Sequence, residues 1–236
     1  MMRIFKYFIL FSLTLSFLGQ MVLAVEDDRF ETSPLTVEDA NNQVQKAVEV
    51  LKKFAETKIP LALLKQAKAL VIMVDSKEIG IGFTIKTGIG VVVVRDAQNQ
   101  WSNPSLITLS GGGWGLKAGV QFSQVVLVYT KASAVDGVIK GKFSIGADVG
   151  VAVGPVSANV GAKTDFSEAL YEYSDSSGLV AGVGLKVDGL KIYDLGNEGL
   201  YGKKVIANDI FAGNVSPDKK ATAVKTLKEL LKEKTS

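Results

Sequence analysis

Glycine is concentrated in one part of this chain, and that concentration limits what the chain can fold into. All but two of its 24 glycines lie between Gly80 and Gly202. Short apolar runs alternate with them, beginning at residues 70–74, 79–85 and 90–95. Glycine within strand-rich sequence marks bulges, sharp bends and barrel corners. The pattern predicts an α+β fold around a strongly curved antiparallel β-sheet, either open or barrel-like.

The densest glycine cluster lies within residues 101–130 and surrounds a tryptophan. Four glycines between residues 111 and 115 flank Trp114. We expect the sheet to bend around a buried Trp114, with positive φ or closely packed backbone at Gly112 or Gly115. A phosphate-binding loop is the alternative interpretation. It requires a lysine, a hydroxyl residue and a helix directly after the last glycine, whereas this segment continues as strand.

The first 24 residues have the features of an export signal. Arg3 and Lys6 form a basic start, residues 8–18 are apolar, and small residues precede a cleavage site after Ala24. A membrane span is less favoured, because Gly19 interrupts the apolar run and acidic residues follow directly. We therefore expect a periplasmic or secreted protein. The chain has no cysteine that would carry a lipid anchor.

Charge and composition exclude several functions. Removing Arg3 and Lys6 lowers the formal net charge from +3 to +1, whereas nucleic-acid-binding domains usually carry a strong basic excess. Without cysteine or histidine, Cys/His metal sites and histidine-dependent catalytic triads are impossible, and we predict no metal and no cofactor. An enzyme would have to use carboxylates such as Asp148, Asp165, Glu168, Asp188 and Asp194. Their spacing indicates surface turns rather than a facing catalytic pair.

Two amphipathic helices are expected before the sheet. Thr36 resembles a helix N-cap with Asp39 three residues later, and apolar residues then recur at helical spacing. Ile59 and Pro60 end this helix, and Pro60 suits the start of a second, short helix over residues 61–67. The apolar face of the first helix, which we expect to pack on the sheet, contains Val44, Val48, Leu51 and Ala55.

A basic amphipathic helix is expected over residues 216–236. Ser216 is a candidate N-cap, Pro217 suits the first helical position, and Asp218 is an early acid. Just upstream, residues 197–202 indicate a turn closed by an aromatic side chain. The polar surface of the helix carries Lys219, Lys220, Lys225, Lys228, Lys232 and Lys234. The sequence leaves open whether this helix docks on the sheet or forms a tail.

The predicted organisation is a signal peptide (1–24), a linker (25–35), one domain (36–215) and the C-terminal basic helix (216–236). Within the domain, an ordered series of short motifs makes the chain resemble the SYLF domain family. The motifs are Ile59-Pro60, Gly88-Ile89-Gly90-Val91-Val92, Arg95, Trp101-Ser102-Asn103-Pro104, Gly111-Gly112, Gly115, Gly119, Gln121, Gly146-Ala147-Asp148, Gly154-Pro155-Val156, Tyr173-Ser174, Gly178-Leu179, Gly182-Val183, Asn197 and Tyr201-Gly202.

The resemblance implies a non-enzymatic protein that binds lipid or an anionic membrane surface. In eukaryotes the SYLF domain accompanies SH3 or FYVE modules in proteins of membrane and actin remodelling, and in bacteria it occurs as exported proteins. The family's membrane contact is an amphipathic helix, which maps onto Lys46, Lys52 and Lys53 as lipid-binding residues. From spacing alone, these lysines also fit the ordinary solvated face of a helix.

The chain departs from the family at two places that often carry basic residues. Ser157 and Ala158 follow the Gly-Pro-Val motif, and Asp175 begins the segment after Tyr173-Ser174. These departures and the expected export make actin a doubtful partner. The predicted partner is a phospholipid or membrane surface of the bacterial envelope, and no nucleic acid. The alternative is a structural module that holds an envelope protein without binding lipid directly.

Overall fold

The computed structural model describes residues 33–140, 142–145, 152–153 and 166–236, with side chains except at 81–82, 114–118, 142–145, 152–153 and 178–188. The expected signal peptide and the predicted burial of Trp114 therefore lie outside the described part. Within it, Pro34–Ser236 form one compact unit. No helix in the described ranges is both long and apolar enough to cross a membrane.

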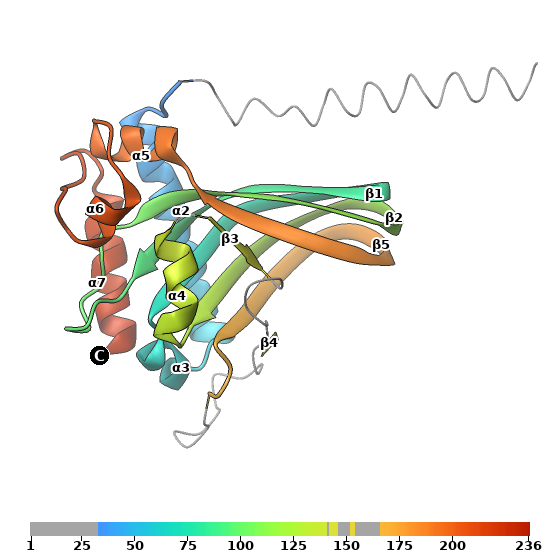
Figure 1. Cartoon of the computed structure of the whole chain (residues 1–236), viewed down its shortest axis with the longest axis horizontal. Helices are drawn as coiled ribbons and strands as arrows, with labels where there is room; N and C mark the ends of the chain where they lie inside the picture. Colours follow the sequence, from blue (N-terminus) through green and yellow to red (C-terminus); the bar gives the residue numbers. More distant parts are fainter. Residues whose placement is uncertain (1–32, 141, 146–151, 154–165) are drawn as a thin grey trace, which may run out of the picture. The chain divides into compact units, whose positions relative to one another are not determined.

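A five-stranded sheet forms the centre of this unit (Figure 1). Its order is β1 (Ala69–Val94), β2 (Ser105–Tyr129), β5 (Leu170–Ile192) and β3 (Lys142–Ile145), and β4 (Ala152–Val153) also pairs with β5. Neighbours in this order pair antiparallel, and only the short β4 runs parallel to β5. With helices packed beside the sheet, the predicted α+β class is confirmed.

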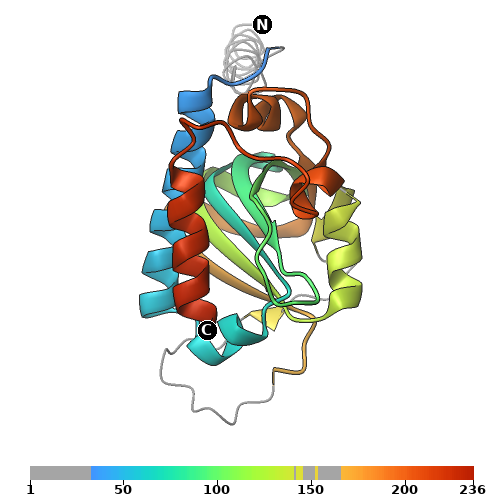
Figure 2. The same cartoon turned by 90° about the vertical axis from the view of Figure 1, so that its left-hand side faces the viewer.

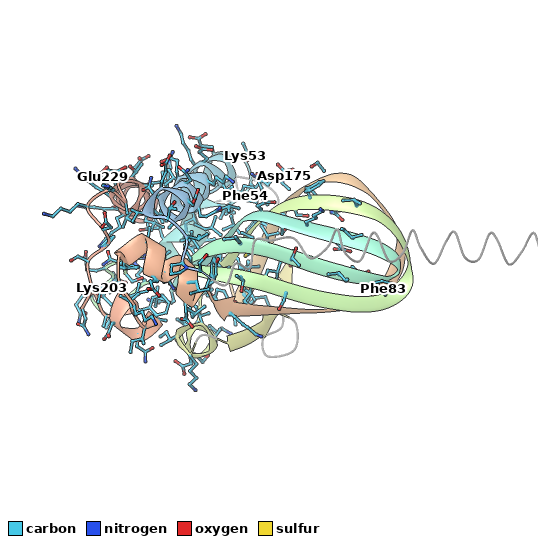
Figure 3. All side chains as sticks on the ribbon, turned by 90° about the horizontal axis from the view of Figure 1, so that it is seen from above. Lys53, Phe54, Phe83, Asp175, Lys203 and Glu229 are labelled. Atoms are coloured by element: carbon cyan, nitrogen blue, oxygen red, sulfur yellow. The ribbon has the colours of Figure 1, made fainter. Side chains whose placement is uncertain are left out.

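Each of the three long strands, β1, β2 and β5, bends back on itself, and the bent strands lie one around the next. Figure 3 shows the ribbons of β1, β2 and β5 curving round at the end of the sheet marked by Phe83. The two arms of β1 meet at their ends. There the amide of Arg95, just after the strand, donates to the carbonyl of Lys68, just before it, at 2.8 Å. A Cβ added at Gly90 would lie 2.7 Å from the carbonyl oxygen of Ile72, so only glycine fits between the arms. The predicted strong curvature is confirmed.

The prediction of several separate short strands is wrong. The runs expected between residues 70 and 95 belong to the single strand β1, which continues to Val94 through two register shifts. Glycine bends these strands without ending them, because it tolerates backbone geometry that other residues avoid. Strand β3 pairs with one arm of the bent β5, and β4 pairs with the other arm. In the described part no pairing joins β3 to β4, so the sheet is open rather than a closed barrel.

The glycine cluster predicted as a bend lies inside β2. A Cβ added at Gly112 would lie 3.3 Å from the carbonyl oxygen of Thr84, so the backbone packs closely there, as expected. The positive φ lies further along, at Gly119 (137°). What surrounds Gly115 lies outside the described part.

The two predicted N-terminal helices are present as α2 (Val37–Thr57) and α3 (Leu61–Gln66). The Thr36 hydroxyl caps α2 by accepting a hydrogen bond from the Asp39 amide at 3.1 Å, which confirms the predicted start. The expected apolar face is buried with the rest of the α2 core residues, Ala40, Val44, Ala47, Val48, Val50, Leu51, Phe54 and Ala55. Burial of this face against the sheet stabilises a helix that would be marginal alone.

Both faces of the sheet are covered near the open ends of the strands. Leu70, Ile72 and Val74 point into a large core shared with α2 and α7, whereas Val71 and Met73 point into a second core beneath α4 (Ala132–Ile139). This alternation follows from the two-residue period of a strand. Helix α4 was not expected, because the sequence pattern predicted that strands continue through this region.

The expected turn at residues 197–202 is wrong, because the chain forms helix α5 (Asp194–Tyr201) there, ending at Gly202 with φ of 67°. Asn197 of α5 is fully buried and binds the first residues of β2. Its side-chain oxygen accepts a hydrogen bond from the backbone amide of Leu106 at 2.7 Å, and its side-chain nitrogen donates to the Ser105 hydroxyl at 2.9 Å. The aromatic Tyr201 donates to the carbonyl of Pro104 at 2.8 Å.

The last helix starts later than predicted. After α6 (Ala207–Phe211), helix α7 spans Ala223–Thr235, so Ser216 and Pro217 do not begin it. The Asp218 amide instead donates to the Leu200 carbonyl at 3.0 Å, which ties this segment to α5. The α7 start is capped from α2, because the Ala223 amide donates to the Asn41 side chain at 2.8 Å. The helix is thus docked rather than a tail.

We predict that Gly90→Ala lowers the free energy of unfolding by about 2 kcal/mol, in the range of overpacked cores. The added methyl carbon would meet the Ile72 carbonyl oxygen at 2.7 Å and the Met73 sulfur at 2.6 Å. Gly189→Ala is the matched control, since its Cβ would have an ordinary contact of 3.5 Å with the Ser110 carbonyl. Urea titration of both variants measures the difference, and equal midpoints would contradict the close packing of the β1 arms.

Candidate anion-binding groove

A groove of about 860 Å³ lies between α7 and the connection from β1 to β2. Figure 2 shows the two segments on the same side of the molecule, α7 in red and the connection in green. The side chains that line the groove come from Arg95, Asn99, Gln100, Trp101, Pro217, Lys219, Ala221, Thr222, Val224, Lys225, Lys228, Glu229, Lys232, Thr235 and Ser236. Its volume falls within the range of sites for small molecules.

Helix α7 forms a fixed wall of this groove. Its apolar stripe, which includes Leu227 and Leu231, is buried in the core shared with α2. At the far end of the helix, the Trp101 indole N–H donates to the Thr235 hydroxyl at 3.0 Å, and that hydroxyl donates to the Leu231 carbonyl at 2.7 Å. Burial along the helix and hydrogen bonds at both of its ends hold the polar face of α7 in place.

Arg95 closes the groove near the end of α7. Its guanidinium donates to the carbonyls of Asn99 (3.1 Å), Lys65 (2.8 Å) and Thr235 (3.5 Å). It also lies over the Trp101 ring, 5.6 Å from the ring centroid. The helices α3 and α7 both end here, and a cation is stabilised by the free carbonyls of a helix C-terminus. Arg95 therefore acts as a clamp between these segments.

The rim of the groove is strongly basic. Arg95 and four lysines face one carboxylate, Glu229, so the lining side chains carry a net charge of +4. Lys225 lies 3.8 Å from Glu229 in an exposed pair, which is worth little. Lys219 and Lys232 make no ion pair with any residue that the structure describes. The groove therefore holds cations that the protein itself leaves largely uncompensated.

The predicted lipid-binding lysines lie elsewhere, on the exposed face of α2. Lys46 and Lys53 line a pocket of about 400 Å³ together with Glu49 and Asp75. Those four side chains sum to no net charge. Lys52 lies on another part of the helix surface, near Glu233 of α7. The hydrogen bond and charge of Lys234 lower the pKa of Glu233, and the charge of Lys52 adds a smaller effect in the same direction. The structure thus brings two of the three together, among acids.

An acid from the sheet neutralises Lys53. The Lys53 ammonium lies 2.5 Å from Asp175 of β5, and the two side chains lie side by side in Figure 3. Lys58 lies 3.5 Å from the same carboxylate. The hydrogen bond from Lys53, with the nearby charge of Lys58, holds the pKa of Asp175 below its ordinary value. This pairing joins segments 122 positions apart, so helical spacing alone gave no signal of it.

The carboxylates considered for an enzyme do not form a visible site. Glu168 and Asp194 are exposed, while Asp148, Asp165 and the side chain of Asp188 lie outside the described residues. Among the residues that the structure describes, no group of three acids could hold a metal ion. The groove residues Arg95 and Trp101 were noted in the sequence as motif residues only. The spacing of Lys225, Lys228 and Lys232 was the available signal for a basic helix face.

The fold and the groove together define an α+β domain with a basic groove on its surface. The family model that matches residues 110–234 is Ysc84, described as Las17-binding protein actin regulator. The chain belongs to this family, which is the SYLF domain family that its motifs resembled. In eukaryotes the family is linked to actin-regulating, Las17-binding proteins.

Curated relatives support the same assignment. SH3 domain-containing YSC84-like protein 1 of Homo sapiens is 32% identical over 184 residues, which are 73% of this chain and 54% of that protein. Protein YSC84 of Saccharomyces cerevisiae is 32% identical over 187 residues, 74% of this chain and 40% of that protein. LAS seventeen-binding protein 3 of the same yeast is 30% identical over 189 residues, 75% and 41% of the two chains. The chain therefore spans about half or less of these relatives. No solved structure matches it.

Proposed function

We propose that this protein is a non-enzymatic binding protein for anionic phospholipid at a membrane surface of the bacterial envelope. The observation that carries the proposal is the groove beside α7, with its net side-chain charge of +4. Each lysine near an anionic membrane contributes about 1 kcal/mol of binding free energy. Four lysines on one rim therefore contribute about 4 kcal/mol of binding free energy to an anionic membrane surface.

The lysines of α2 serve as a second, weaker contact in this proposal. Lys46, Lys52 and Lys53 are all exposed, as the sequence suggested. Their attraction for an anionic surface is reduced by the acids beside them, above all by Asp175 on Lys53. The proposed place of action, periplasmic or secreted, rests on the export signal in residues 1–24.

A protein-interaction module is the alternative, and the names of the relatives favour it. One yeast relative is named LAS seventeen-binding protein 3, and the family model that matches this chain is described as Las17-binding. The basic groove would then hold an acidic segment of an envelope protein rather than a headgroup. Binding to protein-free vesicles separates the two proposals, because only a lipid-binding protein needs no second protein.

The test is cosedimentation of the chain from Val25 onward with vesicles. We expect binding to vesicles that contain phosphatidylglycerol and none to vesicles of phosphatidylcholine alone. Binding should fall steeply with salt, because exposed charges are screened over about 8 Å at physiological ionic strength. Equal sedimentation with both vesicles, or with neither, would remove the proposed function.

We predict that Glu229→Gln strengthens vesicle binding about fivefold, as one charge corresponds to about 1 kcal/mol. Glu229 is the only carboxylate side chain among the lining residues of the groove. It is exposed and makes only the long pair with Lys225, so its loss should leave the fold intact. Glu56→Gln on α2 is the matched control, because Glu56 is exposed and does not line the groove. Circular dichroism checks that the variant is folded, and unchanged affinity would place the membrane contact elsewhere.

A further inference from the structure

We propose that a second pocket of the protein binds a neutral saccharide, with Phe122 as the platform for a sugar ring. The pocket measures about 360 Å³ and lies where the last turns of α2 meet the sheet. Its lining residues are Lys53, Val74, Asp75, Phe122, Ser123, Gln124, Asp175, Ser176 and Ser177. None of them lines the groove beside α7, so the inference concerns a separate site and goes beyond the proposed function.

Phe122 presents an aromatic ring to this pocket, and 47% of the residue is exposed. The register places it opposite Lys77 of β1 and Ser177 of β5, so neither neighbouring strand sets an apolar residue against it. A single exposed apolar residue on an open surface is ordinary. Phe122 differs because it lines a pocket whose other residues are mostly polar. The face of an aromatic ring is partly negative, which suits the C–H bonds on one face of a sugar ring.

Two polar side chains lie on the same face of the sheet as Phe122. Gln124 is two positions further along β2, a distance of about 7 Å, and residues two positions apart in a strand share a face. Asp175 of β5 lies directly opposite Gln124, which makes the amide and the carboxylate neighbours. The amide both donates and accepts hydrogen bonds, and the carboxylate accepts at two oxygens. A sugar ring resting on Phe122 can therefore place adjacent hydroxyl groups against Gln124 and Asp175.

A β-bulge brings a further carboxylate to the pocket. The register between β1 and β2 shifts between Met73 and Ser76, so that Val74 and Asp75 together stand opposite one residue of β2. Adjacent residues of a regular strand point to opposite faces, yet Val74 and Asp75 both line this pocket. Bulges re-aim side chains in this way and are frequent next to active sites. The backbone of β1 thus departs from regular strand geometry where it adds an acceptor to the pocket.

The charges of this pocket are balanced, which favours a neutral ligand. The Asp175 carboxylate lies 2.5 Å from the ammonium of Lys53 and 3.5 Å from that of Lys58. These two lysines and the carboxylates of Asp75 and Asp175 sum to no net charge. An ionic ligand would therefore gain little attraction here. Hydrogen bonds from hydroxyl groups to ionised carboxylates remain strong, which makes a polyhydroxyl compound the class that fits.

A saccharide of several units has room beyond this pocket. A neighbouring pocket of about 400 Å³ extends along α2. Four residues line both pockets, namely Lys53, Val74, Asp75 and Gln124. Because of these shared residues the two pockets adjoin, and each volume lies in the range of sites for small molecules. The proposed ligand is therefore an oligosaccharide rather than a single sugar.

The experiment titrates the chain from Val25 onward with two neutral trisaccharides, chitotriose and maltotriose, followed by NMR chemical shifts. We expect binding of at least one of them, with an affinity that added sodium chloride leaves unchanged, because the site has no net charge to screen. Phe122→Ala should weaken this binding about tenfold, the effect of losing a partly buried ring. Ile206→Ala is the matched control, since Ile206 is 62% exposed and does not line the pocket.

Asp175→Asn separates this site from the membrane contact. Loss of the ionised acceptor should weaken trisaccharide binding about fivefold. The same variant should strengthen vesicle binding, because Lys53 loses its counter-charge. Binding of neither trisaccharide by the unmodified protein would overturn the inference, and so would unchanged affinity in Phe122→Ala that circular dichroism shows to be folded. Both results leave vesicle binding untouched, so the proposed function is decided by its own test.

Discussion

Asn197→Ala should lower the free energy of unfolding by about 4 kcal/mol, a large part of the stability of a domain of this size. The Asn197 side chain is fully buried and bonds both the Leu106 amide and the Ser105 hydroxyl, which are themselves fully buried. Alanine would leave both partners without their bond and without water. Each buried polar group left in that state costs about 1 to 3 kcal/mol. Urea denaturation followed by circular dichroism measures the loss.

The matched control for this variant is Asn214→Ala. Asn214 is exposed, and its amide donates to the Asp209 carboxylate at 3.2 Å. Water replaces such a bond, so we expect a change below about 0.5 kcal/mol. If both alanine variants unfold at the same urea concentration, α5 does not hold the start of β2 through Asn197.

Local sequence patterns predicted the parts of the fold that depend on neighbouring residues. The Thr36 cap and the apolar spacing of α2 lie within a few positions of each other, and the structure confirms them. The apolar run at residues 70–74 was expected to form a strand, and in the structure it alternates between two cores because of the strand period. Neither feature needs information from distant parts of the chain.

The errors occur where distant segments decide the local structure. The glycine-separated runs of β1 read as separate strands, because a bend and a turn have the same local composition. Their continuity depends on register with β2, from Ala69 opposite Tyr129 to Val92 opposite Ser105. The start of α7 was also set from outside, since Asn41 of α2 caps Ala223. Asp218 accepts a hydrogen bond from the Lys220 amide at 2.8 Å, but α7 begins only at Ala223.

For the same reason, the sequence could predict only part of the candidate site. The lysine stripe of α7 follows from helical spacing, but its neighbour across the groove is a connection more than 100 positions away. On α2 the lysines looked equally available until Asp175 of β5 was placed beside Lys53. Burial and ion pairing between distant segments, rather than the count of lysines, decide which basic face can attract an anion.

The largest functional effect is expected when the groove loses its lysines. Replacing Lys219, Lys225, Lys228 and Lys232 by glutamine should weaken binding to phosphatidylglycerol vesicles about 1,000-fold at low salt, since four lysines contribute about 4 kcal/mol. All four are exposed, so the fold should survive, which circular dichroism checks. The salt dependence of the remaining binding should also be flatter, because fewer charges face the membrane.

The triple variant of Lys46, Lys52 and Lys53 provides the decisive comparison, because it removes a similar number of exposed lysines from α2. Lys53 is paired with Asp175, and Lys46 shares its pocket with two acids, so we expect a loss below about tenfold. Cosedimentation of both variants at one salt concentration ranks the two faces. If the triple variant loses more binding than the groove variant, the membrane contact is α2. The lysines beside α7 would then be an ordinary solvated surface.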